Sequence, residues 1–220
     1  MAGKPNCLIV CSSSPQGVSA QSFIPAFTLT HSVFNVQIAT PKGLQVEYVQ
    51  TDENSRKWLN EFRSKPFSVP GKLENVDAFR YSAILIPNAP GALHDLVNDE
   101  ELAKLLNVFI QEKKPICAIG HGVGGLLSAK KDNGKSWSFK NYSMTAPSVL
   151  ELCQTQEFPG LPIILEDSIK DNSGTYSASE PNCVHVVIDR HLITGQNDQS
   201  TLPAVQNLIL YARQGKTTKS

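Results

Sequence analysis

Four short apolar segments constrain the fold of this chain more than any other feature of its sequence. Each is four or five residues long, and stretches with helical periodicity separate them. Short apolar strands that alternate with helices are typical of a parallel sheet whose two faces are both covered. The segments are Cys7–Cys11, Val36–Thr40, Ala83–Pro87 and Ile116–Ile119. We therefore predict an α/β fold, a sandwich of three layers with a mainly parallel central sheet.

Helical patterns occupy much of the chain around these strands. The best marked is residues 98–114, where acidic residues begin the helix, leucines form an apolar stripe and lysines precede Pro115. A helix over residues 17–34 requires Pro25 to sit at a kink, and Thr201 is the expected N-cap of the last helix. The other predicted helices are residues 52–62 and 201–213.

The rest of the chain has shorter or less regular patterns. Residues 162–167 are strand-like, and residues 183–195 have the pattern of two strands that turn at residues 189–191. Prolines and a glycine in residues 63–75 predict a loop that leads back to the sheet. We expect residues 214–220 to form a mobile tail.

Composition and charge favour an ordinary globular protein, predicted to be a single domain over residues 1–220. The chain is 40% hydrophobic and 18% charged, and its twenty acidic residues balance twenty basic ones. No positive field is therefore expected to hold nucleic acid or an anionic membrane surface directly. The five cysteines contain no Cys-x-x-Cys, His94, His185 and His191 lack metal-ligand spacing, and the first apolar run is too short for a signal peptide. We predict a cytoplasmic protein without membrane insertion, metal or cofactor.

The stretch "PICAIGHGVGGLLSA" resembles a catalytic turn without its catalyst. An apolar strand leads directly into Gly120-His121-Gly122 and a series of small residues, which is how α/β enzymes present a nucleophile above the edge of their sheet. Glycine stands where the nucleophile is expected, and it adopts a strained backbone conformation without a Cβ clash. Residues 12–18 and 87–96 should join this turn, since loops at the carboxyl ends of parallel strands converge.

The order of "IPNAPGALHDL", "KPICAIGHGVGGLLSA" and "LITGQN" resembles the DJ-1/PfpI superfamily, which is class I glutamine amidotransferase-like, in its Hsp31-like branch. The resemblance runs from about Cys7 to Leu210 and implies a flavodoxin-like fold. It also implies a catalytic cysteine at the position of Gly120, a following histidine at His121, and a glutamate from the first helix near Gln21 or Ser22. The histidine is present, but the thiol and the carboxylate are both absent.

The loop expected to hold a substrate oxygen departs from the family pattern as well. The paired glycines of the family correspond to Asn88-Ala89, where a side chain at position 89 would enter the space of a substrate carbonyl. The elbow is therefore degenerate and the chain is predicted to be a pseudoenzyme with no catalytic residues. Six residues remain candidates for binding a ligand in the old cleft: Ser14, Asn88, Ala89, Gly91, His121 and Gly122.

Three functions stay open at this point. The first is a scaffold or assembly subunit, and resemblance to a vertebrate member of the family implies a place in an early-endosomal effector complex of a Rab GTPase linked to mRNA transport. Such a protein would bind protein partners, form a homo-oligomer (a dimer or tetramer), and reach endosomes peripherally through those partners. The second is a hydrolase or glyoxalase-like enzyme that uses non-family residues, such as Ser12–Ser14 with His121. The third is a metabolite-binding sensor.

Overall fold

The computed structural model describes residues 3–131 and 134–217, the last four of these by their backbone alone. Its centre is a seven-stranded sheet in the order β12-β13-β7-β6-β1-β3-β5, in which all neighbours are parallel except β12 and β13. The strands are β1 (Asn6–Val10), β3 (Asn35–Thr40), β5 (Gly71–Lys72), β6 (Ala83–Ile86), β7 (Ile116–Ile119), β12 (Val186–Asp189) and β13 (Leu192–Gly195). The four apolar segments and the later hairpin are thus strands, and the predicted α/β fold is confirmed.

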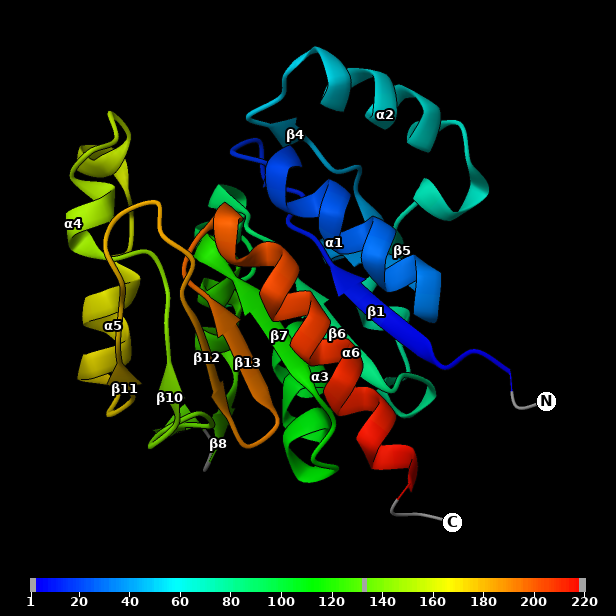
Figure 1. Cartoon of the computed structure of the whole chain (residues 1–220). Helices are drawn as coiled ribbons and strands as arrows, with labels where there is room; N and C mark the ends of the chain where they lie inside the picture. The colour runs from blue at the N-terminus through cyan, green and yellow to red at the C-terminus, as the bar shows by residue number, and fades with distance from the viewer. Residues whose placement is uncertain (1–2, 132–133, 218–220) are drawn as a thin grey trace.

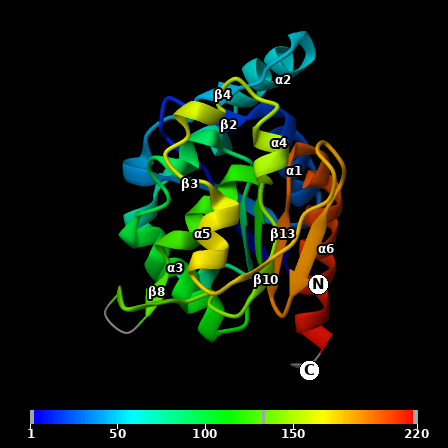
Figure 2. The ribbon, with the colours of Figure 1, turned by 90° about the vertical axis from the view of Figure 1, so that its left-hand side faces the viewer.

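Helices cover the two faces of the sheet, as Figures 1 and 2 show from two sides. One face carries α1 (Ala20–Val33) and α6 (Thr201–Thr217), and the opposite face carries α3 (Glu100–Gln111). The small residues after β7 form a 3-10 helix, η6 (Gly120–Ser128), on the side of α3. These three layers match the predicted sandwich.

Shorter elements surround the sandwich. The segment between β3 and β5 carries α2 (Glu53–Arg63), which lies beside α1, while α4 (Val149–Leu152) and α5 (Leu165–Asp171) lie beyond the β12 edge (Figure 1). Three small sheets pair β2 (Val18–Ser19) with β4 (Tyr48–Val49), β8 (Lys130–Lys131) with β9 (Ser136–Trp137), and β10 (Ser143–Met144) with β11 (Thr175–Tyr176). The remaining 3-10 turns are η1 (Pro41–Gly43), η2 (Pro66–Ser68), η3 (Leu73–Asn75), η4 (Ala78–Arg80), η5 (Pro90–Leu93), η8 (Phe158–Gly160) and η9 (Asp198–Ser200).

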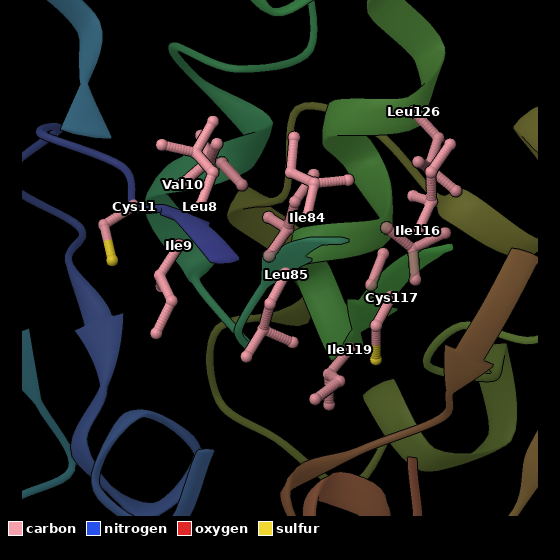
Figure 3. Close-up of a cluster of buried hydrophobic side chains, with 14 of the residues drawn as sticks. Leu8, Ile9, Val10, Cys11, Ile84, Leu85, Ile116, Cys117, Ile119 and Leu126 are labelled. Atoms are coloured by element: carbon pink, nitrogen blue, oxygen red, sulfur yellow. The ribbon is translucent and has the colours of Figure 1, made fainter. Parts of the chain in front are cut away.

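The core lies along the central strands. Side chains of β1, β6 and β7 are fully buried on both sides of the sheet: Leu8, Ile84 and Ile116 point to one side, and Ile9, Leu85 and Cys117 point to the other (Figure 3). Continuous apolar strands are what a parallel sheet needs when helices cover both faces, because neither face meets water. None of the helices in the described part of the chain is long and apolar enough to cross a bilayer.

Two predictions about local structure were wrong. Residues 162–167 do not form a strand, because Leu165 begins α5, which buries Leu165 and Ile169 on one face and pairs Glu166 with Lys170 one turn later. Residues 63–75 are not wholly a loop, since they include the edge strand β5 and two 3-10 turns.

The ends of α1 and α6 also differ in detail from the prediction. Helix α1 begins at Ala20 and continues through Pro25. Asn197, and not Thr201, accepts the capping hydrogen bond at the turn that leads into α6, and the Thr201 hydroxyl donates to Ser22 instead. The predicted tail is helical over residues 214–217, while residues 218–220 lie outside the described residues, so its mobility stays a prediction.

Candidate functional site

Four loops meet at the carboxyl edge of the sheet, as expected for this topology. The loop after β1 contacts the loop after β6, where the Gly91 N–H donates to the Gly17 carbonyl over 3.0 Å. The loop after β6 also contacts the elbow after β7 and the turn after β13 through one side chain, Asn88. The predicted turn from strand to helix lies at Gly120, the first residue of η6.

Gly120 has no room for a side chain. It is buried and has a φ of +54°, a conformation that favours glycine. A Cβ built on its backbone would lie 2.3 Å from Oδ1 and 2.4 Å from Cγ of Asn88. A Cβ at Gly122 would lie 2.3 Å from the carbonyl oxygen of Pro87. The elbow therefore requires glycine at both positions, and the Asn88 carboxamide occupies the place of a nucleophile's side chain.

Asn88 is hydrogen-bonded to three other segments. Its Oδ1 accepts from the His121 N–H over 2.8 Å, its Nδ2 donates to Asp198 Oδ1 over 2.8 Å, and its own N–H donates to Ser22 Oγ over 3.1 Å. In enzymes with this elbow, the N–H after the nucleophile helps to hold the oxyanion. Here the Asn88 side chain already accepts a hydrogen bond from that N–H. The side chain that enters the space of a substrate oxygen is therefore that of Asn88, one residue before the predicted Ala89, which is buried.

Helix α1 directs Ser22 to the site and Gln21 away from it. Ser22 is buried and accepts from both the Asn88 N–H and the Thr201 hydroxyl, the latter over 2.9 Å. Gln21 is exposed. Ser22 therefore faces the elbow at the level where the family resemblance implies a glutamate, and its hydroxyl cannot act as a carboxylate base.

His121 is held as a neutral side chain. The residue as a whole is half-buried, and its Nε2 atom is buried and has no hydrogen-bond partner among the described residues. Burial lowers the pKa of His121 to about 4, and the negative charge of Glu151 opposes that shift only partly. The imidazole is therefore uncharged at neutral pH.

A carboxylate that the sequence analysis did not identify lies behind this histidine. Glu151 of α4 accepts from the Asn182 N–H and Asn197 Nδ2 at Oε1, and from Gln196 Nε2 at Oε2, over 2.8–3.0 Å. Burial raises the pKa of Asp198, and its hydrogen bond from Asn88 acts in the opposite direction. The "LITGQN" run contains Gln196 and Asn197, two of the residues that donate to Glu151, so it marked part of this site in the sequence. No sequence pattern marked Glu151 itself.

The loop serines bond away from the elbow. The Ser14 N–H donates to Ser12 Oγ over 3.0 Å and to Asp95 Oδ2 over 3.1 Å, and the Ser13 N–H donates to the same carboxylate oxygen over 2.8 Å. The Ser14 hydroxyl bonds to Gln16. A serine hydroxyl does contact a histidine ring elsewhere, between Ser177 Oγ and His185 Nε2 at 3.1 Å, after β11. Asn88, Gly91, His121 and Gly122 line the converging loops, but Ser14 is anchored to Asp95.

Neither the Cys117 thiol nor a metal cluster supplies the missing chemistry in the described residues. Cys117 is fully buried in β7, and burial raises the pKa of its thiol well above the ordinary value, so it does not replace the missing nucleophile. In the part of the chain that the structure describes, no group of three or more histidine, cysteine or acidic side chains could hold a metal ion.

Comparisons with known proteins agree with this arrangement of strands and loops. The DJ-1/PfpI family model matches residues 26–209. The chain is 56% identical over 207 residues to glutamine amidotransferase-like class 1 domain-containing protein 1 of Xenopus laevis, covering 94% of this chain and 90% of that protein. The human protein of that name is 50% identical over 209 residues, covering 95% and 94%. Among solved structures, glyoxalase III from Candida albicans superposes with a TM-score of 0.82 at 15% identity, covering 94% of this chain and 97% of that chain.

Proposed function

This chain belongs to the DJ-1/PfpI family, and we propose that it is a catalytically inactive member that acts as a scaffold or assembly subunit. The observation that supports this proposal is the contact between Asn88 and the elbow. The carboxamide takes the place of a side chain at position 120 and bonds to the N–H that would otherwise bind a substrate oxygen. A site filled in this way has neither the nucleophile nor a free oxyanion donor.

The proposed assembly is the one implied by the family resemblance. The protein is a homo-oligomer, a dimer or tetramer, within a multi-subunit early-endosomal effector complex of a Rab GTPase linked to mRNA transport. It is cytoplasmic and reaches endosomes through its partners. A net charge of zero supports RNA contact by those partners and not by this chain, since phosphate binding needs a basic surface.

A turnover screen tests the inactive state. Purified protein and a His121→Ala variant are assayed with α-oxoaldehydes, small esters and peptides, with glyoxalase III from Candida albicans as the positive control for the first class. We expect no turnover by either form. Turnover by the native chain that the His121→Ala variant loses would overturn the proposal and support an enzyme that uses non-family residues.

A second pair of measurements tests the scaffold. Light scattering at micromolar concentration should give a mass above that of the monomer, and affinity purification from cells with mass spectrometry should recover stoichiometric partners. A strict monomer with no stoichiometric partner contradicts the proposal.

One observation favours the sensor as a second candidate. The buried Nε2 atom of His121 has no partner among the described residues, and unpaired buried polar atoms are uncommon in folded proteins. A small ligand with a hydroxyl or other donor would complete that atom's hydrogen bonding. A thermal-shift screen of small metabolites on native protein and His121→Ala tests this, because only the native chain should be stabilised.

A further inference from the structure

A groove between α1 and α2 lies outside the site described above. Figure 1 shows α2 beside α1, on the segment that connects β3 to β5. The groove has a volume of about 320 Å³. Gln21, Ile24 and Pro25 line it from α1, and Asp52, Asn54 and Trp58 line it from the start of α2. It therefore combines apolar and polar side chains from two helices.

A fixed aromatic ring forms one wall of the groove. Trp58 is half-buried, and its ring centroid lies 5.1 Å from Phe62, 5.9 Å from Phe27 and 6.3 Å from Phe23. Phe23, Phe27 and Phe62 are buried, so the indole is held from behind. Such a preformed ring face attracts cations, arginine more often than lysine.

The polar groups of the groove supply acceptors. Pro25 has no N–H to donate to the Gln21 carbonyl four residues earlier, so that carbonyl lacks its α-helical donor. The Asp52 side chain accepts from the Ser55 N–H over 2.7 Å as the N-cap of α2, and its hydrogen bonds with Ser55 lower the pKa of this exposed carboxyl. The carboxylate is therefore charged at neutral pH.

Two cations lie near the start of α2. Lys57 pairs with Glu53 at 3.1 Å, and the Arg56 guanidinium donates to the Thr51 carbonyl over 3.4 Å, while its charge also helps to lower the pKa of Asp52. Within the described ranges Asp52 forms no ion pair. The residues that line the groove thus include an aromatic ring, a carboxylate without an ion-pair partner, and Gln21, whose carbonyl lacks its α-helical donor.

We propose that this groove binds an arginine or lysine side chain in a basic segment of a partner protein. The aliphatic stem lies against Ile24 and Pro25, the cation lies over the Trp58 ring, and its N–H groups reach Asp52 and the Gln21 carbonyl. The occupant follows from charge complementarity, because the groove offers acceptors and a negative charge. This inference rests on the proposed scaffold function and gives it one partner surface.

Binding of short peptides to the full chain tests the groove. The probe is a fluorescein-labelled hexapeptide of alternating glycine and arginine, and its matched control carries citrulline, which is neutral, in place of arginine. Fluorescence anisotropy at low and high salt should show tighter binding of the arginine peptide, with a preference that falls as salt screens the charge.

Two variants and a matched control locate the binding. Asp52→Asn keeps a capping side chain but removes the charge, and Trp58→Leu removes the ring. Each should weaken the arginine peptide by about threefold to fivefold, as expected for an exposed ion pair or cation–ring contact. Asp99→Asn is the control, because Asp99 caps α3 in the same way, accepting from the Leu102 N–H over 2.7 Å, and it should change nothing. Urea unfolding of each variant checks that it is folded.

Three outcomes overturn the inference. They are equal binding of the arginine and citrulline peptides, equal effects of Asp52→Asn and Asp99→Asn, and competition by free spermine at the same concentration as the peptide, which would assign the groove to a small polyamine. Any of these outcomes contradicts the binding of a basic side chain in the groove and leaves the turnover and assembly tests of the scaffold unaffected. Enzymatic turnover in those tests would contradict the proposed function even if the peptide binds.

Discussion

The elbow after β7 and the groove between α1 and α2 are built in opposite ways. At the elbow, polar groups meet one another: the side-chain amide and both backbone polar groups of Asn88 are paired, and no space remains for a side chain at Gly120. At the groove, aromatic rings provide a rigid wall, and acceptors such as Asp52 face an open volume. Position 120 at the elbow has no room for a Cβ beside Asn88, whereas the groove leaves an open volume on a separate segment.

This difference separates two requirements that an enzyme usually combines, a reagent and room for a substrate. At the elbow, position 120 carries no side chain, and the Asn88 carboxamide occupies the adjacent space. A docking surface needs a fixed shape and complementary charge, and the groove has these without any reagent. Variants in each region therefore test whether the elbow is a packed structural contact and whether the groove is a preformed binding surface.

The largest effect is expected from removing the rings behind the groove. Phe23→Ala should lower the free energy of unfolding by about 4 kcal/mol, because Phe23 is fully buried and its ring lies 5.4 Å from Phe62 and 5.8 Å from Phe27. Urea denaturation measures this loss. Phe79→Ala is the control, since Phe79 is 68% exposed and should cost less than about 0.5 kcal/mol. Similar losses for the two variants would show that the aromatic wall is not rigid.

The next effect is expected from restoring the thiol at the elbow. Gly120→Cys should cost about 3 kcal/mol, from backbone strain at a φ of +54° and from the clash with Asn88. It should also fail to create glyoxalase or peptidase turnover, because Ser22 and Gln21 cannot share the thiol's proton as a glutamate does. Urea denaturation and the α-oxoaldehyde assay measure the two outcomes.

A double variant sharpens this result. If the clash with Asn88 is part of the cost, Gly120→Cys combined with Asn88→Gly should lose less stability than the two single variants added together. Strict additivity would mean that the carboxamide does not oppose a side chain at position 120. Efficient turnover by Gly120→Cys alone would contradict the importance of the missing carboxylate.

A third effect is expected from the pH dependence of stability. His121 has a pKa lowered to about 4 in the folded protein, below the value near 6.5 of an unfolded histidine. As pH falls from 6.5 towards 4, the unfolded chain gains a proton that the folded chain does not, so stability present above pH 6.5 is lost. Because the residue is only half-buried, the loss should be on the order of 2 kcal/mol.

The variant His121→Asn removes this titration and should flatten the profile between pH 6.5 and 4. Comparing it with the native chain cancels the contributions of His191, whose pKa burial also lowers, and of Asp198, whose pKa burial raises. Parallel profiles for the two proteins would show that His121 titrates normally and is not enclosed at the elbow.

The smallest effect is expected at the cap of α2. Asp52→Ala should lower the stability more than Asp52→Asn, because the Ser55 N–H loses its acceptor in the first variant and keeps one in the second. Thermal or urea denaturation separates the two. An equal cost for both would mean that the charge of Asp52 supports the fold, and Asp52→Asn would then not be a neutral probe of the groove.

The sequence predicted the sheet well because its strands are buried on both faces. Runs such as Ile116–Ile119 are apolar throughout, shorter than an ordinary helix and followed directly by glycine, which favours a buried strand. The same rule failed at residues 162–167. There a short apolar run precedes acidic residues, and the run marks the start of α5, whose buried positions lie four residues apart.

The site could be predicted only in part. The elbow and the missing reagents are local features of the sequence, and the turn at Gly120 lies where it was expected. The role of Asn88 is not local, since it depends on contacts with Ser22, His121 and Asp198, which are 66, 33 and 110 residues away. Glu151 was missed for the same reason, because its three donors come from loops that only the folded chain brings together.

The interlocking of Asn88 with Gly120 has a consequence for the history of such a protein. A thiol introduced first would collide with the carboxamide, while a glycine introduced first at position 88 would leave the His121 N–H and the Asp198 carboxyl without their partner. Each order of substitution passes through a less stable intermediate, and the carboxylate near Ser22 would still be absent. Under the proposed function, a reagent at position 120 would therefore be gained only through several coordinated changes, because no single substitution provides the thiol, its space and the carboxylate together.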